Sequence, residues 1–466
     1  MESGKPYFFC GIGGSGMLPL ASILRGQGQQ VAGSDRSLDQ QRLGDKFDYL
    51  RSLGIALHPQ DGSGLVSADQ VLVTSAAIEE TVPDVVKGNA LGCARLTRPQ
   101  LLAELFNGAA LGIAVGGTSG KSTVTGMIGW ILHSAGRDPT VMNGAVMKNF
   151  VSDEAPFASA LVGGGDAFVS EVDESDGSIA LYRPKVAVLN NITLDHKSLE
   201  ELRHLFRDFA SKAETMVLNL DDDETRLLAA ALPAGRVVTY SFRDDSADYF
   251  GSGPEDRGGF WQAELTERKS GERRTVRVRT PGLHNLQNAV AAIAASIAAG
   301  VPFGEAADAM AGFEGLRRRF ELVGSARGVE VIDDFAHNPD KIAATLASAR
   351  THGTERLLLY FQPHGYGPLR IMGDALVSAF AAGMRAEDML ILSDPVYYGG
   401  TADRSVGSDS IVEGVRRAGR TAEHIPARSE CGARLAELAR SGDRIVIMGA
   451  RDDSLSQFAR DVLAAL

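Results

Sequence analysis

Apolar runs alternate with amphipathic segments along this chain. Its first part opens with an apolar run over residues 6–10, followed by a glycine-rich turn and a helix-like repeat of apolar positions. Further apolar runs follow at residues 30–33 and 71–75. Short apolar runs bounded by turns are typical of buried strands, and strands that alternate with amphipathic helices favour a parallel sheet. The pattern therefore predicts a βαβ segment that closes near residues 101–106.

A second segment of the same kind begins at the apolar run 109–115, which a glycine-rich turn separates from a helical pattern over 123–133. We expect three further buried strands, at residues 167–170, 186–190 and 216–219. Residues 244–279 are polar and glycine-rich with alternating positions, which predicts antiparallel hairpins at the edge of the sheet. An alanine-rich helix is expected over 288–299.

A third segment begins near Arg317, with strands expected at residues 329–333, 356–361, 389–392 and 443–448. The chain is thus predicted to have an α/β fold of three domains, each built on a mainly parallel sheet with flanking helices. We expect a Rossmann-like domain at 1–108, a central domain of the P-loop ATPase type at 109–315 and a Rossmann-like C-terminal domain at 316–466.

Composition narrows the class of protein. Among 466 residues, 44% are hydrophobic and 23% charged, and the net charge is −12, which argues against a general nucleic-acid binder. The three cysteines, Cys10, Cys93 and Cys431, lack metal or redox spacing and fit a reducing compartment. Neither a signal peptide nor a membrane span is indicated by the hydrophobic pattern. We therefore expect a cytoplasmic protein that contacts no membrane.

The turn at residues 117–122 carries the strongest chemical signal. A glycine-rich turn between a strand and a helix directs backbone N–H groups at an anion, and the helix dipole adds to the attraction. Lys121 can then reach the outer phosphates of a nucleoside triphosphate, and the Ser122 hydroxyl can hold Mg²⁺. The first glycine of the usual phosphate loop is replaced by Val115, so a tight turn without a ligand is the alternative.

A second glycine-rich turn lies near the start of the chain. Gly11, Gly13 and Gly16 follow a predicted strand and precede a predicted helix, and Asp35 lies at the end of the next strand. This spacing is typical of a turn that holds a pyrophosphate, with the acidic residue on a ribose hydroxyl. A UDP-sugar fits it as well as NAD does, and a close-packed turn without a ligand is the alternative.

Carboxylates and a histidine follow two strands of the central segment. Residues 171–176 contain four carboxylates, and residues 191–196 include Asp195 and His196. Glu171 and His196 could supply ligands to Mg²⁺ near the phosphates, because clustered carboxylates repel one another unless a cation neutralises them. A solvated acidic loop beside an unrelated histidine is the alternative.

Polar residues also mark two later positions. His284, Asn285 and Asn288 stand at the start of the alanine-rich helix, where they could cap the helix or bond an adenine edge. The basic cluster 317–319 stands at the start of the third segment, where an arginine could clamp a γ-phosphate when domains close. A solvated linker is the alternative for these arginines.

Taken in this order, the motifs resemble those of the Mur ligase family, over essentially the whole chain. The resemblance implies a three-domain, ATP-dependent ligase that forms an amide bond in peptidoglycan precursor synthesis. The stretches that carry it are residues 11–16 with Asp35, 74–78, 117–122, 171–176, 191–196, 281–288, 318–320, 334–339 and 361–364.

The resemblance also implies roles for individual residues. The UDP-sugar is expected to contact Gly13, Gly14, Ser15, Gly16, Asp35 and Ser75. ATP is expected to contact Gly117, Thr118, Ser119, Gly120, Lys121, Ser122, Thr123, Asn285, Asn288, Arg319, Asp334 and His337. Mg²⁺ is expected on Ser122, Glu171 and His196, and the residues expected to act in catalysis are Lys121, Glu171, His196 and Arg319.

The implied reaction joins the carboxylate of UDP-N-acetylmuramate to an amino acid through an acyl phosphate, with release of ADP. L-Alanine is the expected amino acid, and the protein is expected to be a monomer or homodimer. In the family's alanine branch, His usually stands at the place of Ser119, and an Arg-Tyr or Arg-Phe pair at the place of Gly365 and Tyr366. The alternatives are therefore a ligase that joins a preformed peptide, or a paralogue with another amine. An NAD-dependent oxidoreductase or a nucleotide sensor without activity would belong to a different class.

Overall fold

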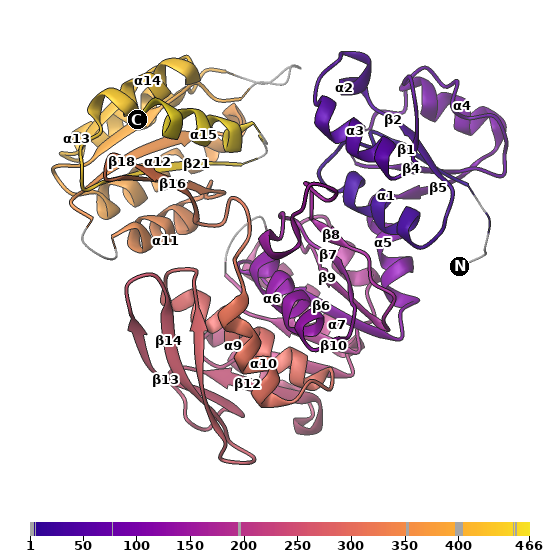
Figure 1. The fold of residues 1–466 in the computed structure, drawn as a ribbon, viewed down its shortest axis with the longest axis horizontal. Helices are drawn as coiled ribbons and strands as arrows, with labels where there is room; N and C mark the ends of the chain where they lie inside the picture. The colour runs from indigo at the N-terminus through magenta and orange to yellow at the C-terminus, as the bar shows by residue number, and fades with distance from the viewer. Residues whose placement is uncertain are drawn as a thin grey trace. The chain divides into compact units, whose positions relative to one another are not determined.

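The computed structural model describes residues 4, 6–76, 78–193, 197–350, 354–396, 404–450, 452 and 454–466. The chain divides into two compact units, Met1–Gly315 and Leu316–Leu466. The first unit contains a five-stranded and a ten-stranded sheet, and the second contains a six-stranded sheet (Figure 1). Most neighbouring strands are parallel, so the expected α/β fold with three mainly parallel sheets is confirmed. Within the described residues, the model contains no helix with the length and apolar character needed to span a membrane.

The five-stranded sheet has the order β3-β2-β1-β4-β5 and is parallel throughout. Its strands are β1 (Tyr7–Cys10), β2 (Val31–Ser34), β3 (Ala56–His58), β4 (Val71–Thr74) and β5 (Ala94–Thr97). Its helices are α1 (Met17–Gly26), α2 (Arg36–Asp39), α3 (Gly44–Ser52), α4 (Pro83–Leu91) and α5 (Arg98–Asn107). Because β2 and β4 flank β1 on opposite sides, the glycine-rich turn after β1 lies at the point where the strand order reverses, where ligands of such sheets bind.

The ten-stranded sheet has the order β15-β14-β13-β12-β11-β10-β6-β9-β7-β8. Its strands are β6 (Leu111–Gly116), β7 (Thr140–Met142), β8 (Ala160–Leu161), β9 (Ala167–Glu171), β10 (Val186–Leu189), β11 (Thr215–Asn219), β12 (Val237–Ser241), β13 (Tyr249–Asp256), β14 (Trp261–Glu267) and β15 (Arg273–Val278). Strands β13, β14 and β15 pair antiparallel at one edge, which confirms the hairpins expected over 244–279.

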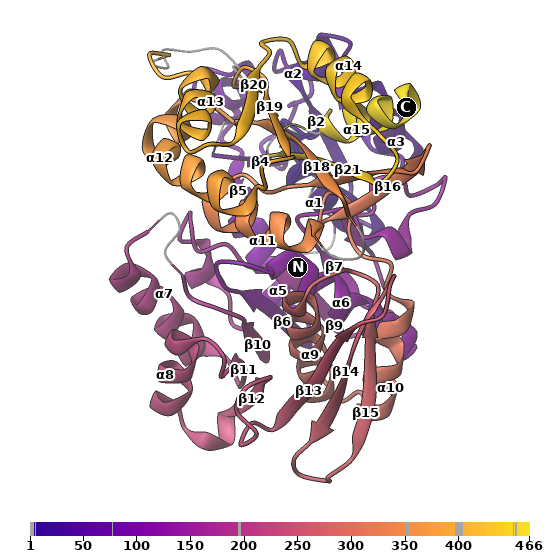
Figure 2. The ribbon, with the colours of Figure 1, turned by 90° about the vertical axis from the view of Figure 1, so that its left-hand side faces the viewer.

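Five helices and four short 3₁₀ turns accompany this sheet among the described residues. The longer helices are α6 (Lys121–Ser134), α7 (Leu199–Lys212), α8 (Asp223–Ala231) and α9 (Leu283–Ala298), followed by α10 (Phe303–Ala309). The 3₁₀ turns are η1 (Lys148–Phe150), η2 (Ser178–Leu181), η3 (Ala234–Arg236) and η4 (Met310–Gly312). Helices α6 and α9 lie side by side (Figures 1 and 2). The buried alanines of α9 allow this close approach, because small side chains let helix backbones come together.

Aromatic packing joins the two sheets of the first unit. The ring of Phe106 in α5 lies 5.9 Å from the ring of Phe168 in β9 and 5.1 Å from the ring of Tyr182, both in edge-on geometry. All three side chains are almost fully buried. The apolar core of α5 is therefore continuous with that of the ten-stranded sheet, which explains why residues 1–315 form one compact unit. The domain boundary that we propose at residues 108 and 109 falls between α5 and β6.

The sheet of the second unit has the order β16-β17-β21-β18-β19-β20, and its only antiparallel pair among the described strands is β16 with β17. Its strands are β16 (Glu321–Ala326), β17 (Val329–Asp334), β18 (Arg356–Gln362), β19 (Met389–Leu392), β20 (Thr421–His424) and β21 (Asp443–Gly449). Its helices are α11 (Pro339–Ala349), α12 (Tyr366–Gly383), α13 (Ser408–Arg417), α14 (Arg428–Leu438) and α15 (Leu455–Ala465).

Strand β18 shows why helices cover both faces of this sheet. Leu357, Leu359 and Phe361 pack with α11, α12 and α13, whereas Leu358 and Tyr360 pack with α14 and α15. Successive side chains of a strand point to opposite faces, so a strand with an unbroken apolar run, here residues 357–361, must be covered on both.

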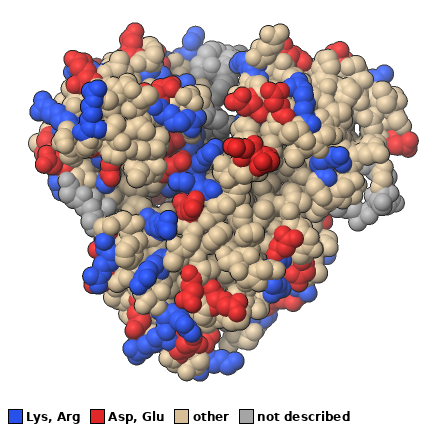
Figure 3. Space-filling model, in the orientation of Figure 1, with Lys and Arg blue, Asp and Glu red and all other residues tan. Residues whose placement is uncertain are grey.

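Charged side chains are mixed over the surface. On the described part of the face drawn in Figure 3, lysines and arginines are interspersed with aspartates and glutamates. This mixture accords with the net charge of −12. A phosphorylated ligand would thus be held by a local set of donors.

Candidate active site

The phosphate loop connects the end of β6 to the start of α6. Gly117 has a φ of 120° and Gly120, which caps α6, has a φ of 85°. Residues with a side chain rarely adopt a positive φ, so glycine is favoured at both positions. The resulting turn places the N-terminus of the 14-residue helix α6 at the loop, where its dipole attracts an anion.

Lys121 is held inside this loop by two acceptors. Its Nζ donates to the Gly117 carbonyl at 2.7 Å and to Oε2 of Glu174 at 2.9 Å. The Glu174 side chain is only 5% exposed. Glu174 is one of four carboxylates in residues 171–176, and their spacing does not reveal which of them is buried beside the lysine.

Ser122 and Glu171 meet where β6 and β9 end. The Ser122 hydroxyl donates to Oε2 of Glu171 at 2.7 Å, and the parallel register pairs Val115 with Glu171. The amide of Asn143 donates to the Ser122 carbonyl at 2.9 Å. Gly144 leaves space for the carboxylate, because a Cβ there would lie 2.0 Å from Oε1 of Glu171. Two of the three predicted metal ligands are therefore adjacent, and the third, His196, lies outside the described residues.

The side chain of Asn191, which follows β10, holds the phosphate loop in place. Its Oδ1 accepts bonds from the Thr118 hydroxyl and from the backbone N–H of Ser119, both at 2.8 Å. Its Nδ2 donates to the Ser119 carbonyl at 3.2 Å. The Thr118 hydroxyl also contacts that of Thr193 at 2.7 Å. Asn191 is the first residue of the motif 191–196, but only the contact between β6 and β10 reveals what its amide does.

Asn285 and Asn288 belong to a buried chain of amides beneath the same loop. Oδ1 of Asn288 accepts from Asn190 at 3.2 Å, and its Nδ2 donates to Asn285 at 3.3 Å. A Cβ on Gly120 would lie 2.7 Å from Oδ1 of Asn288. These amides therefore pack directly against the phosphate loop at Gly120. Their expected contact with adenine stays a prediction.

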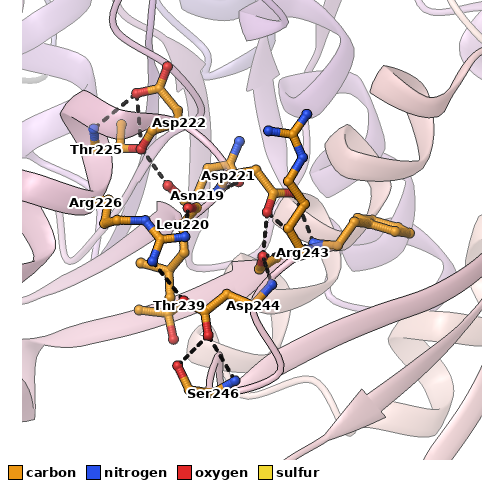
Figure 4. Close-up of polar contacts among 12 residues, drawn as sticks. Asn219, Leu220, Asp221, Asp222, Thr225, Arg226, Thr239, Arg243, Asp244 and Ser246 are labelled. Carbon is orange, nitrogen blue, oxygen red and sulfur yellow. Dashed lines mark hydrogen bonds and ion pairs between the residues drawn. The ribbon is translucent and has the colours of Figure 1, made fainter.

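A polar network near the start of α9 is organised by Asp221, which follows β11 (Figure 4). Its carboxylate accepts bonds from the backbone N–H groups of Phe242 at 2.9 Å and Arg243 at 3.2 Å, and from the hydroxyl of Ser241. Its Oδ2 also accepts from the Gln287 amide at 3.1 Å. The carboxyl ends of β11 and β12 are thereby connected to the N-terminal part of α9.

The glycine-rich turn of the five-stranded sheet is held by Asp35. Oδ2 of Asp35 accepts the backbone N–H of Gly13 at 2.9 Å, and Oδ1 accepts that of Ser37 at 2.8 Å, which caps α2. Among the described residues, the backbone N–H groups of Ser15 and Gly16 have no hydrogen-bond partner. They stand just before α1, so this turn offers free donors to an anion.

One cavity of about 560 Å³ joins the two glycine-rich turns of the first unit. The predicted residues that line it are Gly14, Ser15, Gly16, Asp35, Ser75, Lys121 and Glu171. Gly13 contacts Asp35 behind the turn, and Asn285 and Asn288 lie beneath the phosphate loop. The cavity also contains Arg98 and Tyr182, which sequence reasoning missed because nothing in the local pattern of α5 or η2 indicates a ligand.

The second unit carries three predicted residues around Phe335. The guanidinium carbon of Arg319 lies 4.7 Å from the centre of the Phe335 ring, and the His337 ring lies 5.5 Å from it. Asp334 accepts bonds from the backbone N–H of Phe320 at 2.6 Å and of Ala336 at 2.8 Å. These bonds hold the turn that presents Arg319 and His337, and their role toward a nucleotide stays a prediction.

Burial shifts the pKa of two of these groups in opposite directions. Burial raises the pKa of Asp334 above its usual value, although Arg319 and the backbone bonds act against that shift. Burial, followed by the charge of Lys341, lowers the pKa of His337 to about 3. His337 is therefore neutral near pH 7, with its Nδ1 2.8 Å from the Phe335 carbonyl.

Three family models match consecutive parts of the chain. The Mur ligase family catalytic domain matches residues 6–109, the Mur ligase middle domain matches 115–296, and the Mur ligase glutamate ligase domain matches 318–451. Together they cover most of the chain in the order expected from the motifs.

Curated relatives align over nearly the full length. The UDP-N-acetylmuramate–L-alanine ligase of Streptomyces coelicolor is 36% identical, over 96% of this chain and 95% of that protein. The ligase of the same name from Clavibacter michiganensis is 36% identical, over 100% and 94%. A Cyanothece ligase of that name is 34% identical, over 99% and 95%.

Solved structures share the fold. The UDP-N-acetylmuramate–alanine ligase of Thermotoga maritima superposes with a TM-score of 0.79 at 22% identity, covering 98% of each chain. A murein peptide ligase from Psychrobacter arcticus superposes with a TM-score of 0.69 at 24% identity, covering 99% of this chain and 98% of that one. From its motifs, its three matched domains and its full-length relatives, the chain belongs to the Mur ligase family.

Proposed function

We propose that this protein is an ATP-dependent ligase that joins the carboxylate of UDP-N-acetylmuramate to the amine of L-alanine and releases ADP and phosphate, in peptidoglycan precursor synthesis. The observation that carries the proposal is the shared cavity. The turn suited to a sugar nucleotide and the loop suited to a triphosphate open into one space of about 560 Å³. The names of the full-length relatives support the same acceptor and amine.

In the first step, an oxygen of the muramyl carboxylate attacks the γ-phosphorus of ATP, and the bond to ADP breaks. Lys121 lies at the N-terminus of α6, where its ammonium can neutralise charge on the transferred phosphoryl group. Gly117 and Glu174 accept two of its three N–H groups, so the third can donate to a phosphate oxygen, against the repulsion of the Glu174 carboxylate. The loop N–H groups hold the remaining phosphates in line with the acceptor.

The oxygens of Ser122 and Glu171 fit Mg²⁺. They are hard donors lying 2.7 Å apart, and Mg²⁺ is usually held by one or two protein oxygens together with phosphate oxygens and water. When bound, Mg²⁺ neutralises charge on the phosphate oxygens. Gly144 and Asn143 keep the two side chains in position for it.

In the second step, the amine attacks the acyl carbon, and phosphate leaves from the tetrahedral intermediate. The amine must lose a proton as the amide bond forms. Positioning of the two reactants in one cavity from which water is displaced would supply much of the rate, because an acyl phosphate is already activated.

The direct test supplies ATP, Mg²⁺ and UDP-N-acetylmuramate and measures phosphate release with L-alanine, L-serine, glycine or a preformed tripeptide. We expect the fastest release with L-alanine. A preference for the tripeptide would instead favour the peptide-joining alternative. Absence of release with every amine would refute the ligase, and full activity of Lys121→Ala would refute the role given to that lysine.

The alternative functions differ in which cavity residues they leave without a role. An oxidoreductase would use the first glycine-rich turn but leave Lys121 and Glu171 without a role in the same cavity, and we do not propose it. A cytoplasmic location and a monomer or homodimer stay predictions. Fractionation of cells and sedimentation of the purified protein would test them.

A further inference from the structure

Arg98 is a cavity residue to which none of the motifs assigns a role. It is the first residue of α5, whose start is set by a capping box between Thr97 and Gln100 and by Pro99. Its side chain lines the cavity and is 28% exposed. Within the described residues, its one polar contact is with Oδ2 of Asp176, at the long distance of 3.8 Å. Most of its five N–H donors are thus available to a ligand.

The guanidinium of Arg98 lies against the first glycine-rich turn. A Cβ added to Gly16 would lie 2.9 Å from Cδ of Arg98 and 3.4 Å from Nε and Nη1. The absence of a side chain at Gly16 therefore lets the arginine approach the backbone at the N-terminus of α1. This is a packing reason for the third glycine of the turn.

Two kinds of unused donor converge at this end of the cavity. The backbone N–H groups of Ser15 and Gly16 have no partner among the described residues, and Arg98 adds a planar fork of N–H groups. The carboxylate of Asp35 does not compete for them, because its oxygens accept from Gly13 and Ser37. The ligand that matches free backbone donors beside a guanidinium is a phosphate or diphosphate.

We propose that Arg98 binds the diphosphate of the sugar-nucleotide acceptor, exchanging its long contact with Asp176 for bonds to phosphate oxygens. This inference rests on the proposed function for the identity of the acceptor. Beyond the proposed function, it states that α5, which lies outside both glycine-rich turns, supplies the cation for that diphosphate. Lys121, which starts α6 and lines the same cavity, remains for the triphosphate.

The test measures equilibrium binding of UDP, UDP-N-acetylmuramate and uridine to the full chain, without turnover. Arg98→Ala should weaken binding of both diphosphates by roughly 10- to 100-fold, the usual loss for hydrogen bonds to a charged group. Uridine binding should stay within about twofold, since uridine carries no phosphate. Arg98→Lys should be intermediate, because lysine keeps the charge but not the fork. With turnover, the KM for UDP-N-acetylmuramate should rise and the KM for ATP should not.

Two further variants separate binding from a merely structural role. Asp176→Asn removes the charge that pairs with Arg98 but keeps Arg98, so it should bind UDP at least as tightly as the wild type. Arg95→Ala is the matched control, because Arg95 lies three residues earlier and contacts Thr74 and Glu80 instead of the cavity. It should bind UDP like the wild type.

The outcomes distinguish this inference from the proposed function. If Arg98→Ala binds UDP as tightly as the wild type, or if Asp176→Asn weakens UDP binding as much as Arg98→Ala does, the inference is wrong. Both results concern binding alone. If the wild type binds UDP through Arg98 but releases no phosphate with any amine, the inference stands and the ligase proposal fails.

Discussion

The ammonium of Lys121 and the carboxylate of Glu174 form a largely buried ion pair, 2.9 Å apart, at the phosphate loop. A ligand phosphate must compete with this carboxylate for the same cation. Removing one partner would leave the other charge uncompensated, which destabilises the protein without a nucleotide. The Glu174 carboxylate also opposes nucleotide binding, because it already neutralises the ammonium and repels a phosphate.

Glu174→Gln should reveal this competition. We expect the free energy of unfolding without nucleotide to fall by about 1–3 kcal/mol, because the charged partner of a largely buried lysine is lost. Saturating ATP with Mg²⁺ should then raise the midpoint of thermal unfolding more in the variant than in the wild type. The control is Glu264→Gln, which removes an exposed partner of Arg273 and should change neither quantity. An equal or smaller nucleotide effect in Glu174→Gln would contradict the competition.

Gly144→Ala should disturb the predicted metal ligands without touching them. The new Cβ would lie 2.0 Å from Oε1 of Glu171, so the carboxylate must move away from Ser122. We expect the Mg²⁺ concentration for half-maximal phosphate release to rise by roughly 10- to 100-fold, as for other changes that displace a metal ligand. Gly235→Ala, with nothing within 4 Å of its Cβ, is the control. An unchanged Mg²⁺ requirement in Gly144→Ala would argue against Glu171 as a ligand.

Asp35 should be needed for the shape of the first turn. Asp35→Ala removes the partner of the Gly13 N–H and the cap of α2, so unfolding should become easier by about 0.5–2 kcal/mol. Asp35→Asn keeps one accepting oxygen and should lose less. The KM for UDP-N-acetylmuramate should rise in the same order, measured by phosphate release. Asp48→Ala, at an exposed pair with Arg51, should be neutral to within about 0.5 kcal/mol. Equal stability of Asp35→Ala and the wild type would refute this role.

His337 should make the second unit sensitive to acid. The pKa of His337 is about 3 in the folded protein, whereas the ordinary value for a histidine is 6.5. Between these two pH values, the unfolded chain binds one more proton than the folded protein. Stability from this group is complete above about pH 6.5 and is lost on acidification by up to about 1.4 kcal/mol per pH unit. Thermal unfolding should therefore show a smaller fall between about pH 7 and pH 5 in His337→Gln than in the wild type.

An exposed histidine provides the control for that comparison. His204→Gln, on the surface of α7, should retain the wild-type dependence on pH. If His337→Gln loses as much stability on acidification as the wild type does, the imidazole is not held neutral by its surroundings.

Much of the fold follows from local pattern. Strands β1, β4, β6, β18 and β21 were predicted because each is an apolar run bounded by turn residues. Strands β3, β16 and β20 were not predicted, since they are short or partly exposed and lack such a run. The partners of β3 and β20 lie more than 20 residues away in the sequence, whereas β16 pairs with β17, the next strand. In all three, strand character depends on the completed sheet.

The residues of the candidate site also fall into two groups, those that the sequence predicts and those that only the fold reveals. By itself, the sequence determined the two glycine-rich turns, Lys121, Ser122, Glu171 and the family, because these signals lie within a few residues of one another or recur in a characteristic order. Only the tertiary structure decided that Glu174 is the acid beside Lys121, that Asn191 holds the loop and that Arg98 shares a cavity with both turns. The physical reason is that parallel register and the packing of α5 on β9 bring these residues together, and neither can be deduced from the spacing of residues along the chain.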